Sequence, residues 1–124
     1  MTDVKTIDTL EVYLLANELS DEIWNLVSVW SHFEKDTIGK QVVRSADSIS
    51  ANIAEGYGRF SYKENRQFCF YARGSILETK TWLLKAKNRN LIAQDVYENL
   101  FSKLELTHIK LNAYMKYIGK TKKE

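Results

Sequence analysis

The chain has 124 residues, of which 44% are apolar and 27% charged, with 18 basic and 16 acidic side chains, five glycines and no proline. This balance excludes an intrinsically disordered chain, which combines few apolar residues with high net charge, and the length suffices for one ordinary hydrophobic core. Met1 to Leu10 contains no apolar secretory segment. No apolar run in the sequence reaches the roughly 18 residues of a membrane span. Cys69 is the single cysteine, so no internal disulfide can form. We therefore expect one cytoplasmic domain covering residues 1–124.

Apolar residues alternate at spacings of three and four along the first half of the chain, which indicates amphipathic helices. The first helix is expected over residues 9–31, with an inward seam from Val12 to Trp30. The second is expected over residues 37–57, because the Thr37 hydroxyl can cap free backbone N–H groups and Gly56 and Gly58 mark an end. It is rich in serine and alanine, and these small side chains permit a close helix neighbour.

Two further helices complete the pattern. Ser61 and Glu64 have the spacing of a capping box, so the third helix is expected over residues 62–88 and the fourth over residues 94–118. Gly119 then ends the fourth helix before a basic tail, residues 119–124. Four long helices with short connections predict an all-α protein with the fold of an antiparallel up-down four-helix bundle.

A polar stripe runs along the second helix at spacings of three and four. Its members are Arg44, Ser48, Asn52, Glu55 and Arg59. One interpretation is a half-buried hydrogen-bond network that fixes helix register. The other is a small polar site at an interface.

The third helix carries a line of cations, four of them seven residues apart. The members of this basic ridge are Lys63, Arg66, Arg73, Lys80 and Lys87. Arg73 is expected to pair internally with Glu78 or Glu55, and the other four to point outward. Residues 1–36 have a net charge of −6 and residues 37–124 a net charge of +8. This asymmetry favours either complementary faces that meet when copies associate or a surface that attracts phosphate, while a merely solvated face is the simplest alternative.

The first and third helices also carry more apolar side chains than one core stripe can use. These are Tyr13, Leu15, Trp24 and Val27 on the first helix, and Phe70, Tyr71, Leu77, Trp82 and Leu84 on the third. Such a surplus is typical of an association surface. A wide core is the alternative.

Signals for catalysis are weak. His32 and His108 have no carboxylate or histidine at ligand spacing. Neither histidine lies near Cys69 in the sequence, so a buried structural thiol is expected there rather than a nucleophile. We expect no metal, no cofactor and no enzymatic activity.

The run from Arg44 to Arg59 (RSADSISANIAEGYGR), followed by Ala72 to Glu78 (ARGSILE), closely resembles a bacterial family of four-helix-bundle proteins. These proteins were first noticed as reading frames in the intervening sequences of 23S ribosomal RNA. The resemblance implies a ring-like homopentamer, related in shape to the accessory variability determinant proteins of diversity-generating retroelements. The chain departs from the family in lacking the proline that often lies between the first two helices, where residues 31–36 stand.

Carried over by position, the resemblance adds Arg73, Ser75 and Glu78 to the polar stripe, and the family brings no settled enzymatic activity. We therefore expect a non-enzymatic, homo-oligomeric scaffold or adaptor that binds RNA or DNA through its basic surface. The alternative is a protein–protein interaction module without nucleic-acid binding. A third reading, a small hydrolase or transferase using Asn52, Glu55 and Arg59, is the least favoured.

Overall fold

The computed structural model describes residue 7 and residues 10–121, and this part of the chain is helical, with no strand. Four long helices form the molecule: α1 (Glu11–Val27), α3 (Lys40–Tyr57), α4 (Tyr62–Asn88) and α5 (Gln94–Lys120). A short α2 (His32–Glu34) and a π-helical turn, η2 (Lys35–Gly39), lead into α3. The expected start of the first helix at residue 9 and the tail residues 122–124 lie outside the described residues.

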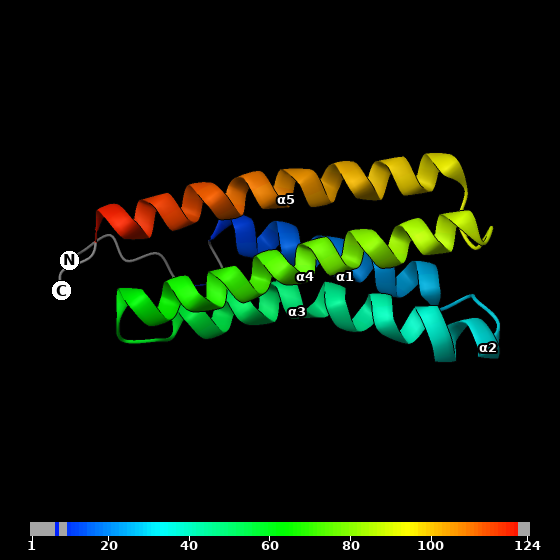
Figure 1. Ribbon diagram of the computed structural model, residues 1–124, viewed down its shortest axis with the longest axis horizontal. Coiled ribbons are helices and arrows are strands. Elements are labelled where there is room, and N and C mark those ends of the chain that lie inside the picture. Colours follow the sequence, from blue (N-terminus) through cyan, green and yellow to red (C-terminus); the bar gives the residue numbers. More distant parts are fainter. Residues whose placement is uncertain (1–6, 8–9, 122–124) are drawn as a thin grey trace.

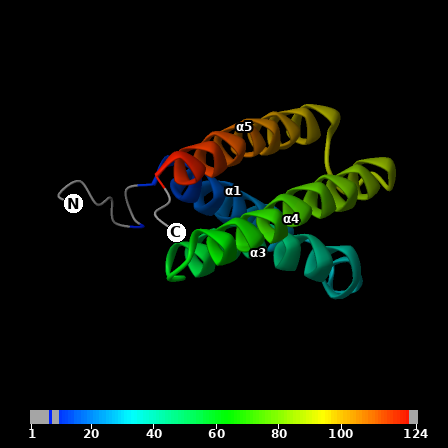
Figure 2. The same cartoon turned by 60° about the vertical axis from the view of Figure 1, so that its left-hand side comes forward.

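The four long helices lie side by side. Helix α4 lies between α3 and α5, and α1 packs against α3 and α5 from behind, as Figures 1 and 2 show. Each helix therefore has two neighbours, and the apolar seams meet at the centre. None of the helices in the described residues is both long and apolar enough to cross a membrane.

The core is built from the seams that the sequence indicates. Side chains that are no more than 1% exposed include Leu19 and Ile23 of α1, Ile49 and Ile53 of α3, and Leu104 of α5. Leu26, Tyr57, Phe68 and Ile118 are only half-buried. Val27, which the sequence places among surplus apolar residues, is buried and belongs to the core.

The first helix is shorter than expected. Helix α1 ends at Val27 rather than at residue 31, and the chain then turns. Trp30 still reaches the core, where it is 9% exposed, because its backbone N–H donates to the Val27 carbonyl at 2.9 Å and folds the turn back. The burial of Trp30 thus comes from the turn and not from a longer helix.

The second helical run begins earlier than expected, because another residue caps it. Ser31 and Glu34 form a complete capping box: the Glu34 N–H donates to Ser31 Oγ, and the Ser31 N–H donates to Glu34 Oε1. Thr37 is not a cap; its hydroxyl donates to the Phe33 carbonyl at 2.8 Å, one turn back along the helix. The run is helical from His32 to Tyr57, with the π-helical turn between Lys35 and Gly39.

Helices α3 and α4 approach each other closely at Gly56. A β-carbon on Gly56 would lie 2.8 Å from Phe68 Cβ and 3.0 Å from the Asn65 carbonyl oxygen. Such separations are too short for any side chain, so the residue at this position must be glycine for the two helices to pack as they do.

The last two helices are joined by a left-handed turn. Helix α4 covers the expected residues 62–88, and Asn90 adopts φ 64°. The Leu91 N–H donates to the Ala86 carbonyl and the Asn90 N–H to the Lys87 carbonyl, the pair of hydrogen bonds of a Schellman motif. Asparagine tolerates this conformation better than most residues, so the turn needs no glycine. Helix α5 continues past Gly119 to Lys120.

Candidate functional site

The basic ridge lies along the flank of α4 that faces α5. Its last four members follow one another at seven-residue steps beside the buried seam of Cys69, Ala72, Ile76 and Thr79. Lys63 and Arg66 are exposed, whereas Arg73, Lys80 and Lys87 are half-buried. The ridge is thus open near the start of α4 and partly covered toward its end.

The two arginines of the ridge stack on aromatic rings. The Arg73 guanidinium lies 4.9 Å from the centre of the Phe70 ring, and Arg66 lies 5.8 Å from the same ring and 5.5 Å from that of Tyr62. A guanidinium that stacks on a ring keeps its N–H edge available for hydrogen bonds to a carboxylate or phosphate. Arg73 therefore does not need the internal pairing with Glu78 or Glu55 that the sequence suggests.

Lys80 is the member of the ridge that points inward, contrary to the sequence-based expectation. Its side chain is 15% exposed, its Nζ donates to Glu105 Oε2 at 2.8 Å, and it lies 4.8 Å from the Phe101 ring. The hydrogen bond from Lys80, together with its charge, lowers the pKa of the Glu105 carboxyl. Lys87 lies 5.2 Å from the Tyr97 ring. Both lysines therefore hold α4 to α5.

Exposed apolar side chains stand next to the cations on α4. Phe70, Leu77 and Leu84 recur every seven residues and are 36%, 53% and 42% exposed, and we call them the apolar strip. On α1, Leu14 and Trp24 are 49% and 61% exposed. Large exposed apolar residues in regular register on one helix face are typical of a contact surface.

The polar stripe of α3 does not form one network in the described part of the chain. The Ser48 hydroxyl donates to the Arg44 carbonyl at 2.8 Å, and the Asn52 side chain donates to the Ser48 carbonyl at 2.9 Å. Both bonds return to the same helix one turn earlier. Arg44, Glu55 and Arg59 are exposed. In place of the expected half-buried network, the stripe therefore has separate hydrogen bonds and ion pairs between residues close in sequence.

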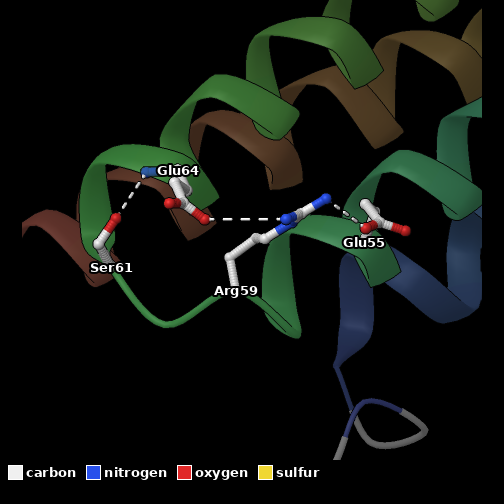
Figure 3. Close-up of polar contacts among 4 residues, drawn as sticks. All are labelled: Glu55, Arg59, Ser61 and Glu64. Atoms are coloured by element: carbon white, nitrogen blue, oxygen red, sulfur yellow. Dashed lines mark hydrogen bonds and ion pairs between the residues drawn. The ribbon is translucent and has the colours of Figure 1, made fainter.

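The end of the stripe connects α3 to the start of α4 (Figure 3). Arg59 pairs with Glu55 at 2.7 Å and lies 3.9 Å from Glu64, and its guanidinium lies 4.9 Å from the Phe68 ring. The Glu64 N–H donates to Ser61 Oγ at 3.1 Å, as the capping-box spacing predicts. The Glu64 carboxylate faces Arg59, so only one half of the expected box is formed.

The three residues carried over from the second motif lie apart from the stripe. Arg73 stacks on Phe70, the Ser75 carbonyl accepts a hydrogen bond from Thr79 at 2.7 Å, and Glu78 accepts one from the Trp82 indole at 3.1 Å. All three contacts therefore lie within α4.

The buried polar contacts of the bundle are ones that sequence reasoning missed. The Ser45 and Thr79 hydroxyls lie 2.8 Å apart and join α3 to α4 in the core, and Asn65 donates to the Tyr114 hydroxyl at 3.2 Å between α4 and α5. Thr79 occupies a seam position between Ile76 and Leu83, and a polar residue in a seam indicates a buried partner. The position of Thr79 in the seam was therefore the sequence signal that could have predicted a buried hydrogen bond.

The groups that could perform chemistry are sparse. Cys69 is fully buried, and burial raises the pKa of its thiol to about 11, which suppresses the reactive thiolate. Among the described residues there is no group of three or more histidine, cysteine, aspartate or glutamate side chains that could hold a metal ion. The surface features above are therefore the candidate site.

Comparison with known proteins now gives the family. A family model described as 23S rRNA-intervening sequence protein matches residues 8–113. The chain belongs to the 23S rRNA-intervening sequence protein family. No curated protein matches the chain.

A solved structure from Bacteroides thetaiotaomicron has the same fold. It is a protein of unknown function from the S23 ribosomal protein family, 24% identical, and the match covers 85% of this chain and 98% of that one with a TM-score of 0.76. At this identity the similarity supports the helical architecture alone.

Proposed function

We propose that this member of the 23S rRNA-intervening sequence family is an antiparallel up-down four-helix bundle that assembles with copies of itself and acts as a non-enzymatic scaffold or adaptor. The observation that supports self-assembly best is the apolar strip of α4, whose Phe70, Leu77 and Leu84 are each at least 36% exposed. Burial of such side chains against a second copy removes apolar surface from water, the main driving force of association.

Opposite charges beside two exposed apolar faces favour a heterologous contact. The exposed side of α1 carries Glu18 and Asp21 beside Leu14 and Trp24, whereas the strip on α4 is flanked by the basic ridge. An α1 face of one copy against an α4 face of the next matches apolar to apolar and acidic to basic. Head-to-tail contacts form a ring when the rotation between successive copies closes, and we propose such a ring in line with the homopentamer that the family resemblance implies.

Nucleic acid is the partner that we propose for the open part of the ridge. Lys63 and Arg66 are exposed, and the stacked guanidinium groups retain donors for phosphate oxygens. The family description refers to intervening sequences of 23S rRNA. We expect this assembly to work in the cytoplasm.

The second candidate is a protein–protein module without nucleic-acid binding. It is favoured by Lys80 and Lys87, which are engaged by Glu105 and the Tyr97 ring and so leave fewer cations for phosphate. In this reading the ridge holds α5 in place and borders the interface between copies.

Self-assembly is tested by light scattering at micromolar concentration. We expect a mass that is a multiple of 14.5 kDa, with a fivefold multiple for the ring. Replacing both Leu77 and Leu84 by Ser should lower the mass, whereas Val29→Ser should not, although Val29 is 82% exposed, because it lies outside the strip. A mass near 14.5 kDa for the unmodified protein contradicts the proposal.

Nucleic-acid binding is tested by titrating single-stranded RNA at low and moderate salt. Changing Lys63, Arg66 and Arg73 to Gln should lower the slope of log affinity against log salt by about 2, because each phosphate contact contributes roughly 0.7. Lys80 and Lys87 are left intact so that the α4–α5 contacts survive. The matched control changes Arg89, Lys116 and Lys120, three exposed cations outside the ridge, to Gln. Equal effects of the two triple variants, or no binding by an intact oligomer, favour the protein–protein module.

A further inference from the structure

A cavity of about 420 Å³ opens between the end of α1, the π-helical turn η2 and the start of α3. Its volume lies within the range of small-molecule sites, about 300–1,000 Å³. Trp24, Val27 and Val43 provide most of its apolar wall, and Lys35, Lys40 and Arg44 bring three cations to it. Among the residues that the structure describes, no acidic side chain lines it.

The local backbone explains why a cavity forms here. A β-carbon on Gly39 would lie 2.8 Å from Val27 Cγ1, so α1 packs directly on the backbone of η2. One turn earlier along α1, Trp24 is not covered in this way and remains 61% exposed. Single π-helical turns are frequently found at functional sites, and this one leads directly into α3.

The charges around the cavity are only partly compensated. Lys40 lies 3.4 Å from Asp36, an exposed ion pair. Within the described part of the chain, neither Lys35 nor Arg44 forms an ion pair with a carboxylate. Two cations thus border an apolar wall without an internal partner.

We propose that this cavity binds an organic anion with an apolar body. The body packs against Trp24, Val27 and Val43, and a carboxylate, sulfonate or phosphate group lies between Lys35 and Arg44. A free inorganic anion would leave the apolar wall exposed to water, and a neutral ligand would leave Lys35 and Arg44 without an opposite charge. This inference does not rest on nucleic-acid binding, and the cavity shares Trp24 with the α1 face that we propose contacts the next copy.

Two fluorescent probes with the same aromatic skeleton test the proposal. 1-Anilinonaphthalene-8-sulfonate is the anion, and N-phenyl-1-naphthylamine is its uncharged counterpart. The protein should bind the anion with one site per chain. The double variant Lys35→Gln/Arg44→Gln should bind the anion about tenfold more weakly, because two charge contacts at a partly dehydrated wall are lost, and should bind the neutral probe almost unchanged.

A matched control is available on α5. Lys116 and Lys120 border another open groove with the exposed Ile109 and Tyr117, so the variant Lys116→Gln/Lys120→Gln removes two cations beside a similar apolar surface. It should leave the affinity for both probes unchanged. An equal loss in both double variants, or no loss in either, overturns the proposal.

A second variant tests the apolar wall without changing the charge. Val43→Thr keeps the shape of the side chain and replaces a methyl group by a hydroxyl. The affinity for both probes should therefore fall several-fold, while the helical circular dichroism signal stays the same. Unchanged affinity for both probes in this variant means that they bind elsewhere and also overturns the proposal.

Discussion

The α3–α4 contact and the α1–α5 contact show two different ways to join helices. Between α3 and α4 the backbones come close at Gly56, and the Ser45 and Thr79 hydroxyls meet in the core. Between α1 and α5 the helices are bridged at the surface by Lys103 with Glu22, at 2.6 Å, and by Lys110 with Glu11, at 3.3 Å. Two open clefts of about 250 and 570 Å³ accompany the second contact.

The difference follows from side-chain size. Helix α3 presents serine, alanine and glycine to α4, and small residues let two helices pack at short range. Helices α1 and α5 present long charged side chains at their edges, which span a wider seam and keep their charged ends in water. We therefore expect α3–α4 to be sensitive to added volume and α1–α5 to be sensitive to salt and charge.

The largest effect is expected from Gly56→Ala. The added methyl group would overlap Phe68 Cβ and the backbone of Asn65, and such overpacking costs about 2–3 kcal/mol of the free energy of unfolding. Gly74→Ala on the same helix pair is the matched control, because nothing lies within 4 Å of its added β-carbon. It should stabilise the protein by about 0.5–1 kcal/mol, since alanine favours a helix interior. Urea denaturation measures the free energy of unfolding of both variants, and equal changes in the two would contradict the close contact at Gly56.

A smaller loss is expected from Thr79→Val. The variant keeps the shape of the buried side chain but removes the hydroxyl that lies 2.8 Å from Ser45 Oγ. The loss costs about 1–1.5 kcal/mol, because the buried Ser45 hydroxyl loses this partner and keeps the Val42 carbonyl at 3.2 Å. A double-mutant cycle with Ser45→Ala should give a coupling of at least about 0.5 kcal/mol. Strict additivity would mean that the two hydroxyls do not interact.

Breaking the α1–α5 bridge should have a weaker effect. Lys103→Gln removes the partner of Glu22 in a pair whose side chains are 43% and 36% exposed, and such pairs contribute less than about 1 kcal/mol. The difference from the unmodified protein should vanish in about 1 M salt, where charges are screened within about 3 Å. The loss in Gly56→Ala should persist at the same salt concentration, and thermal unfolding at two salt concentrations separates the cases.

The smallest effect is expected at Asp47 of α3. Burial raises the pKa of its carboxyl, and the charge of Asp21 on α1 raises it further. A carboxyl whose pKa is higher in the folded state favours folding below its ordinary pKa, and this contribution is lost as the pH rises through the folded value.

Asp47→Asn should therefore raise the unfolding temperature slightly at neutral pH, by less than Lys103→Gln lowers it, and the gain should disappear in acid. Asp36→Asn, which removes the partner of Lys40, should give no gain at neutral pH. Unfolding temperatures measured between acid and neutral pH compare both variants. A higher unfolding temperature at neutral pH for Asp36→Asn alone would contradict the raised pKa of the Asp47 carboxyl.

Much of the helical layout could be predicted from the sequence. Apolar spacing predicts the seams because the periodicity of a helix determines which residues share a face. The Ser61 cap predicts the start of α4 at the residue where it is found, since a cap depends on a few neighbouring residues. The ANIAEGYGR and ARGS motifs likewise point to the family that the comparison shows.

Tertiary structure decided the remaining features, because the spacing of residues along one helix does not determine which residues of another helix contact it. The sequence analysis predicts Thr37 as the cap, but Ser31 caps the run because Glu34 completes its box while Trp30 folds into the core. Seven-residue spacing places Lys80 on a basic ridge, but only the packing of α5 supplies Glu105 and Phe101 to draw it inward. The Ser45–Thr79 contact and the cavity beside Trp24 arise in the same way. Each depends on the distance between helices, which the volumes of side chains on both partners determine together.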